Sequence, residues 1–137
     1  MTYFERYFAR LDGPDPHSSL ELVSADVEFS IQWASGSDHS SKQFVGGLDE
    51  LRAFIDAGDT RGWAHHILHS GRSGEVEFAL GETRWEDSGQ RIGTFLAVAE
   101  LDDQGRMRRY LATRTPALAF DVAVHTADPR GSRSDPE

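Results

Sequence analysis

The sequence is first of all informative through what it lacks. Its 137 residues contain no cysteine, which excludes disulfide bonds, thiolate–zinc sites, iron–sulfur ligation and a cysteine nucleophile. No apolar run approaches the roughly 20 residues of a membrane-spanning helix. The first residues, Met-Thr-Tyr-Phe-Glu-Arg, have no hydrophobic stretch of the kind found in secretory signal peptides. We therefore expect a cytoplasmic protein without a membrane partner, in which any catalysis uses His, Asp, Glu, Arg or Tyr.

Positive charge is also scarce. Lysine and arginine total 14 against 23 aspartates and glutamates, giving a net charge of −9. This acidic balance argues against nucleic acid as a partner, since phosphate binding needs basic surface. The 38% of hydrophobic and 27% of charged residues are typical of a globular chain, and the length suits one domain. We expect a single domain over residues 1–120 and a flexible, mostly polar tail over residues 121–137.

Three helices are predicted from spacing and capping signals. Thr2 with Glu5 three residues later fits a capping box, and the first helix ends at Asp12-Gly13-Pro14. A short second helix begins at Asp15-Pro16 and runs through Leu22. The apolar stripes of the first and third helices are formed by Phe4, Tyr7, Phe8 and Leu11, and by Leu48, Leu51, Phe54 and Ile55.

The rest of the chain has the period of β-strands. Alternation from Val27 to Trp33 indicates a strand with one buried face. The polar stretch from Ala34 to Ser41 is interpreted as a loop, and Phe44 and Val45 as a short strand before Gly46-Gly47. Short glycine-containing connectors then separate four further segments rich in β-forming residues, which predicts an antiparallel meander. These segments are Trp63–Ser70, Glu75–Trp85, Arg91–Leu101 and Met107–Thr115. The fold class is therefore α+β.

Three strings of residues, in this order of elements, carry a resemblance to a known family. They are Phe44-Val45-Gly46-Gly47, His65-His66-Ile67-Leu68, and the segment from Gly105 to Tyr110. Over about Tyr3 to Ala117 the chain resembles the SnoaL-like branch of the nuclear transport factor 2-like superfamily, a cystatin-like fold. The resemblance implies a cone, in which a strongly curved mixed or antiparallel sheet wraps around three N-terminal helices and leaves an apolar cavity. It also implies homodimers through the outer sheet face.

Such relatives include polyketide cyclases, ketosteroid isomerase, scytalone dehydratase, limonene epoxide hydrolase and many non-enzymes, so the fold alone does not define the function.

Histidines are the first candidates for chemistry. On a strand, His65 and His69 share a face but lie roughly 13 Å apart at about 3.3 Å per residue, too far for one metal ion. His65 and His66 point to opposite faces, so only one of them can enter the cavity. We expect neither a metal nor a cofactor. The inward histidine is either a hydrogen-bonded strand residue or an acid–base group.

A second candidate is the triplet Glu82, Arg84 and Glu86, which shares one face of a regular strand. An arginine between carboxylates can hold them ionised and orient one towards a water. The triplet resembles the Arg-x-Asp segment of the epoxide hydrolase branch, but Ala112 stands where that branch has its last-strand aspartate. The alternative is an outward, salt-bridged strand face. A bulge at Gly81 would reverse every inward assignment after it.

Aromatic residues complete the candidate site, with Tyr110 as a phenol beside the histidine. The candidate catalytic residues are thus His65, His66, Arg84, Glu86 and Tyr110. The aromatic residues expected to contact a ligand are Phe29, Trp33, Trp63, Phe78, Trp85 and Phe95. Asp26 is either a further carboxylate of the site or a turn residue, and Arg106, Arg108 and Arg109 are interpreted as a solvated edge.

Two functions remain open. The first is a SnoaL-like pocket protein that binds a hydrophobic small molecule without turnover, which the absence of any acid from Met107 to Thr115 favours. The second is a small cofactor-independent enzyme of the cyclase, isomerase, dehydratase or hydrolase type. It would use a cavity histidine with Arg and Glu, or with Tyr.

Overall fold

The computed structural model describes residues 1–34, 41–58 and 62–118. It has the predicted order of elements, with a 3₁₀ helix (η1) in second place and a first strand that begins at Val23 rather than Val27. The loop predicted from Ala34 to Ser41 lies mostly outside the described residues, and the tail predicted over residues 121–137 lies entirely outside them. The elements are α1 (Tyr3–Leu11), η1 (Pro16–Leu22), β1 (Val23–Ala34), β2 (Ser41–Gly46), α2 (Leu48–Ala57), β3 (Trp63–Ser73), β4 (Val76–Trp85), β5 (Arg91–Leu101) and β6 (Met107–Pro116).

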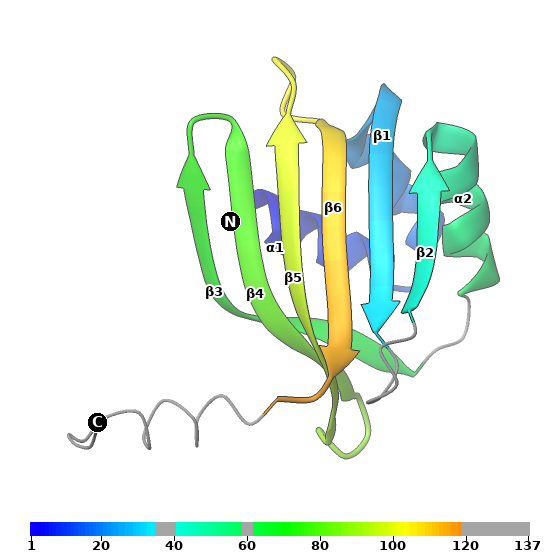
Figure 1. The fold of residues 1–137 in the computed structure, drawn as a ribbon, viewed down its shortest axis with the longest axis vertical. Helices are drawn as coiled ribbons and strands as arrows, with labels where there is room; N and C mark the ends of the chain where they lie inside the picture. Colours follow the sequence, from blue (N-terminus) through cyan, green and yellow to red (C-terminus); the bar gives the residue numbers. More distant parts are fainter. Residues whose placement is uncertain (35–40, 59–61, 119–137) are drawn as a thin grey trace.

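The described strands form one sheet in the order β2-β1-β6-β5-β4-β3. β3 to β6 pair antiparallel as the predicted meander, whereas β1 and β6 pair in parallel, so the sheet is mixed. Figure 1 shows α1 behind the centre of the sheet and α2 beyond its β2 edge. The predicted α+β class, with helices on one face of a curved sheet, is confirmed.

A bulge interrupts the pairing of β3 with β4. Their register shifts between Ile67 and His69, opposite Gly81. A Cβ atom at Gly81 would lie 2.2 Å from the carbonyl oxygen of His66 and 2.7 Å from the Phe95 ring, so only glycine permits this close approach. The extra residue therefore lies in β3, and β3 sweeps beneath the other strands (Figure 1).

The core lies between α1 and the concave face of the sheet. The α1 stripe of Tyr3, Phe4, Tyr7 and Phe8 is buried together with alternate residues of the strands, including Ala97 and Ala99 of β5. The predicted capping box is present, with Thr2 Oγ1 accepting the Glu5 N–H at 3.2 Å. The buried carboxylate of Glu77 accepts the Phe4 N–H at 2.9 Å, which ties the positive end of α1 to β4.

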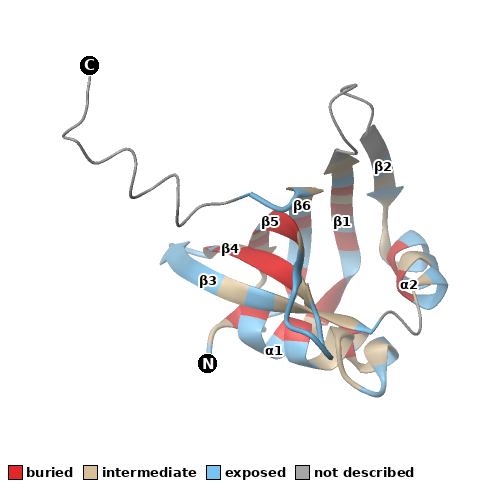
Figure 2. Ribbon diagram, turned by 90° about the horizontal axis from the view of Figure 1, so that it is seen from below, coloured by how far each residue is buried: buried red, intermediate tan, exposed pale blue. Residues whose placement is uncertain are grey.

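The opposite face of the sheet carries an exposed apolar row. Val45, Ser30, Leu111, Val98 and Phe78 are successive cross-strand partners on β2, β1, β6, β5 and β4, and directly paired residues share a face. Val45, Leu111 and Phe78 are 56%, 48% and 39% exposed. Figure 2 shows exposed and intermediate residues alternating with the buried ones along the strands. Among the described helices, none is long and apolar enough to cross a membrane.

Candidate functional site

A cavity of about 290 Å³ lies between the concave face of the sheet, α1, η1 and α2. Its wall is mainly apolar, with contributions from all three helices and from β1, β2, β3, β5 and β6. Its polar and charged side chains that could take part in acid–base chemistry or bind an ion include Tyr7, His65, Tyr110 and Arg114. An apolar enclosure with a few polar groups is typical of a small-molecule site.

The main polar group of the wall is His65, which is bonded to Asp12 behind it. Nδ1 of His65 lies 3.0 Å from Oδ2 and 3.1 Å from Oδ1 of Asp12. The same carboxylate accepts the backbone N–H of His65 at 2.8 Å. Both side chains are largely buried, with 13% of His65 and 9% of Asp12 exposed. The carboxylate thus fixes the position of the His65 backbone and the orientation of its ring, with Nδ1 towards Asp12.

The end of α1 builds this pair. Asp12 is the C-cap of α1, and its backbone N–H donates to the Phe8 carbonyl at 2.9 Å. Phe8 and Asp12 are four residues apart, so their side chains leave the same side of the helix. The Phe8 ring stacks on the imidazole with centroids 4.1 Å apart and an angle of 7°, while Phe95 meets it edge-on at 5.1 Å. The imidazole is therefore held on its faces by aromatic rings and at Nδ1 by the carboxylate.

Tyr110 lies deeper in the same wall. Its ring contacts those of Phe4 and Tyr7, with centroids 6.1 and 5.9 Å away. Burial, followed by the neighbouring Tyr7, Tyr3 and Asp12, raises the pKa of Tyr110 well above the usual value. The phenol consequently stays protonated at neutral pH and acts as a hydrogen-bond donor.

Arg114 brings a positive charge to the cavity. Its Cζ lies 4.5 Å from the ring centroid of Trp63 and 5.4 Å from that of Trp33. Both distances are within the range of cation–π attraction. Arg114 follows Tyr110 and Ala112 at alternate positions of β6, and all three line the cavity, as the period of a strand requires.

The other sequence candidates lie elsewhere. His66 is exposed and pairs across the strands with Glu82. Arg84 donates from Nε to Glu82 at 2.9 Å, and Glu86 is exposed in the turn after β4, with its backbone N–H bonded to the Gly62 carbonyl at 3.0 Å. The structure thus pairs Arg84 with Glu82 and brings His65 and Tyr110 to the cavity.

The expected ligand contacts divide into three groups. Trp33, Trp63 and Phe95 line the cavity. Phe29 is buried in the core, whereas Phe78 and Trp85 are 39% and 42% exposed. Among the described residues no three His, Asp or Glu side chains lie close enough together to form a metal site.

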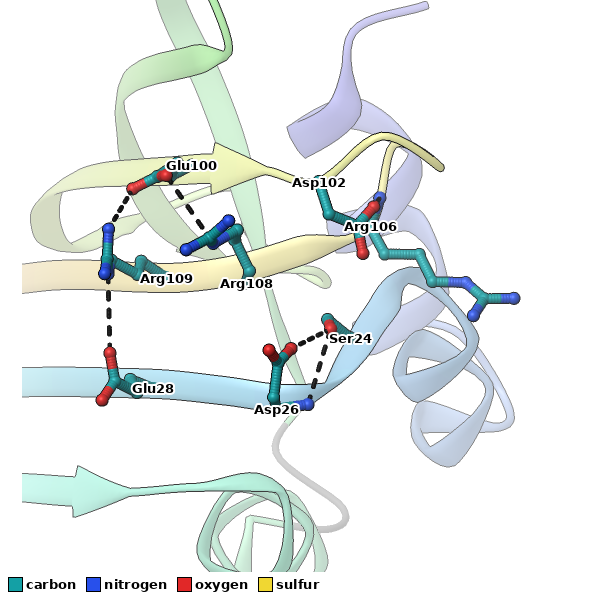
Figure 3. Close-up of polar contacts among 8 residues, drawn as sticks. All are labelled: Ser24, Asp26, Glu28, Glu100, Asp102, Arg106, Arg108 and Arg109. Carbon is teal, nitrogen blue, oxygen red and sulfur yellow. Dashed lines mark hydrogen bonds and ion pairs between the residues drawn. The ribbon is translucent and has the colours of Figure 1, made fainter.

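Arg108 and Arg109, at the start of β6, face acids on neighbouring strands, whereas the side chain of Arg106, in the turn before β6, extends away from them (Figure 3). Arg109 donates to Glu100 at 2.9 Å and lies 3.5 Å from Glu28, and Arg108 lies 3.6 Å from Glu100. Asp26, labelled nearby, is exposed on β1 and accepts a hydrogen bond from the Ser24 hydroxyl. That bond lowers the pKa of Asp26. Arg108, Arg109, Glu28 and Glu100 form a network of surface ion pairs, and neither they nor Asp26 line the cavity.

Two residues of the site were not recognised in the sequence. Asp12 was interpreted only as the end of a helix, because its contact with His65 spans 53 residues of the chain. Its spacing of four from Phe8, on the apolar stripe, was the signal that could have indicated an inward position. Arg114 could have been found by extending the alternation from Tyr110.

Comparison with known proteins shows what the fold is similar to. No protein-family model and no curated protein sequence matches the chain. A SnoaL-like family protein from Agrobacterium tumefaciens has a TM-score of 0.62 and 13% identity, over 82% of this chain and 93% of that one. A nuclear transport factor 2-like protein of unknown function from Burkholderia pseudomallei has a TM-score of 0.59 and 20% identity, over 80% and 86%.

A third structure, a limonene epoxide hydrolase-like epoxide hydrolase of Mycobacterium tuberculosis, has a TM-score of 0.57 and 15% identity, over 82% of this chain and 79% of that one. At such identities the likeness concerns the fold. The chain has the nuclear transport factor 2-like fold that SnoaL-like proteins share, as the resemblance implied.

Proposed function

We propose that this protein is a small cofactor-independent enzyme that moves a proton on a hydrophobic molecule held in the cavity, with His65 as the acid–base group. The observation that carries the proposal is that His65 lines an apolar cavity while its Nδ1 is held by the Asp12 carboxylate. Isomerisation and elimination are the reaction types that such a proton transfer serves. The bound molecule contributes the atoms that react, and the chain contributes the base.

The geometry determines which nitrogen of His65 is the base. An ionised carboxylate only accepts hydrogen bonds, so the neutral imidazole beside Asp12 carries its proton on Nδ1 and its lone pair on Nε2. When Nε2 takes a proton, the resulting imidazolium is 3.0 Å from a carboxylate oxygen, which stabilises the new charge. Asp12 is therefore a positioning residue that acts through His65.

The remaining polar groups of the wall suit the same reaction. Removing a proton from a carbon atom next to a carbonyl leaves negative charge on oxygen, and a protonated phenol can donate to that oxygen. Tyr110 supplies such a phenol, because it lines the cavity and a tyrosine is protonated at neutral pH. The aromatic residues Trp33, Trp63 and Phe95 supply the surface for the apolar part of the molecule.

The test uses 5-nitrobenzisoxazole, a planar apolar molecule whose ring opens when a base removes the proton from C3. The N–O bond breaks in the same step and releases a coloured phenolate, so no other reactant is needed. We expect the wild-type protein to accelerate this reaction and His65→Ala to lose about 10²–10⁴-fold of the acceleration. His69→Ala is the matched control, because His69 is an exposed histidine of the same strand. The acceleration by Asp12→Asn should lie between those of the wild-type protein and His65→Ala.

The alternative is a protein that binds a hydrophobic molecule without turnover. The absence of an acidic side chain from β6 favours it, since the sequence from Met107 to Pro116 has none. Under this alternative, the wild-type protein and His65→Ala open the probe at equal rates. That result would contradict the enzyme proposal.

We further propose that the protein is a homodimer through the outer sheet face, as the resemblance implied, and that it is cytoplasmic. The exposed row that includes Val45, Leu111 and Phe78 supports a dimer, because an isologous interface uses the same patch on both subunits. Sedimentation velocity of the wild-type protein should give a dimer and that of Leu111→Lys a monomer. Gln104→Lys, in the exposed turn before β6, is the control. A wild-type monomer at micromolar concentration would refute the dimer.

A further inference from the structure

The cavity holds a positively charged group beside its largest aromatic residues. Arg114 Cζ lies 4.5 Å from the Trp63 ring centroid and 5.4 Å from the Trp33 ring centroid. The rest of the wall is mainly apolar, and a charge in such a medium interacts strongly with any opposite charge that enters. An arginine here is therefore a strong feature for selecting a ligand.

We infer that the molecule bound in this cavity is a hydrophobic carboxylate, and that Arg114 binds its carboxylate group. The inference rests on the proposed function, because it specifies the molecule on which His65 acts. A guanidinium stacked on an aromatic ring uses its flat face, while its five N–H donors lie in its plane. Stacking on Trp63 is thus compatible with a bidentate hydrogen-bonded pair to a planar carboxylate.

A second, independent feature lies beside Arg114. The Thr83 side chain is fully buried, and within the described part of the chain its Oγ1 has no hydrogen-bond partner. Such a buried hydroxyl destabilises the free protein unless another molecule supplies a partner.

Glycine at position 93 brings the two groups together. A Cβ atom on Gly93 would lie 3.2 Å from Nε of Arg114 and 3.3 Å from Oγ1 of Thr83. Both atoms therefore lie next to Gly93 of β5, which has no side chain to separate them. A carboxylate at Arg114 would offer an acceptor oxygen to the Thr83 hydroxyl.

The position of Trp63 relates this anion site to the base. The ring centroid of His65 lies 5.2 Å from that of Trp63, and Arg114 Cζ lies 4.5 Å from it. His65 and Arg114 are thus close enough together for one small molecule to contact both. The carboxylate would anchor one end of an apolar body, and the atom that loses its proton would lie at His65.

The test compares 2-naphthoate with 2-naphthamide, which has the same apolar body and a neutral head group. Affinities are measured by isothermal titration calorimetry at pH 7. We expect the wild-type protein to prefer the naphthoate by about ten- to a hundredfold. Arg114→Met, which keeps an unbranched apolar stem, should abolish the preference while the naphthamide affinity changes less than threefold. Arg108→Met is the matched control, because Arg108 is an arginine of the same strand that is exposed and paired with Glu100.

Two further variants test the details. Arg114→Lys keeps the charge and loses the planar fork, so it should retain part of the preference. Thr83→Val should raise the melting temperature of the free protein and weaken naphthoate binding several-fold, because it removes the buried hydroxyl. Equal wild-type affinities for the two probes, failure of both to bind, or a preference that survives in Arg114→Met would each overturn the inference. The proposed function is judged separately, by the loss of 5-nitrobenzisoxazole opening in His65→Ala, since that probe has no carboxylate.

Discussion

Replacing Asp12 with alanine removes the group that holds His65, and the structure gives the magnitude of the effect. The carboxylate accepts the backbone N–H of His65 at 2.8 Å and lies 3.0 Å from Nδ1, with 9% of the Asp12 side chain exposed. A hydrogen bond to a charged acceptor contributes about 1.5–3 kcal/mol, and the buried donors left behind are costly. We expect Asp12→Ala to lower the free energy of unfolding by about 3 kcal/mol, and Asp12→Asn, which keeps one acceptor oxygen, by about half of that.

Urea denaturation followed by far-ultraviolet circular dichroism at pH 7 measures this difference. The matched control is Asp15→Asn, because Asp15 is exposed and makes no side-chain cap hydrogen bond at the start of η1. It should change the free energy of unfolding by less than about 0.5 kcal/mol. A loss below about 1 kcal/mol in Asp12→Ala would refute the reasoning that the two hydrogen bonds to His65 are buried and strong.

Two further predictions concern the sheet and the buried tyrosines. Gly81→Ala should lower the free energy of unfolding by about 3 kcal/mol or more, since its Cβ would lie 2.2 Å from the His66 carbonyl. Gly71→Ala, with no atom within 4 Å, should cost nothing in the same urea titration; equal losses would contradict the bulge geometry. Burial raises the pKa of both Tyr3 and Tyr110, so the folded protein keeps protons that the unfolded chain releases above about pH 10. Stability should therefore be unaffected by these groups below pH 10 and fall above it. The free energy of unfolding of Tyr110→Phe should fall less steeply with pH than that of the wild-type protein between pH 9 and 11. Equal slopes for the two proteins would argue against the burial of the phenol.

Local signals in the sequence were sufficient for the elements of the fold. The Thr2–Glu5 capping box and the aromatic stripe of α1 act within two helical turns, and the turns of the meander use glycines with positive φ at Gly74, Gly89 and Gly105. The parallel pairing of β1 with β6 could not be read in the same way, because it joins Phe29 to Tyr110. Such pairings depend on the packing of the whole sheet.

The site was predictable in part. The period of a strand restricted the cavity to either His65 or His66, but the choice between them depended on where the bulge lies. The structure places the extra residue in β3, after Ile67, so His65 keeps its inward position. Arg84 could not be assigned from alternation alone, since the register of β4 and β5 shifts between Thr83 and Arg84. The contact of Asp12 with His65 connects the end of one helix to a distant strand, and no local pattern indicates such a contact.

The position of the proton on the neutral His65 ring shows whether Nε2 can act as the base. Long-range ¹H–¹⁵N correlation spectra of protein with labelled histidine report which ring nitrogen carries the proton in the neutral state. Comparison with His65→Gln assigns the signals. We expect the proton on Nδ1, held by Asp12, and the lone pair on Nε2. A neutral His65 with its proton on Nε2 would rule out the proposed role of His65, because Nε2 could not then act as the base.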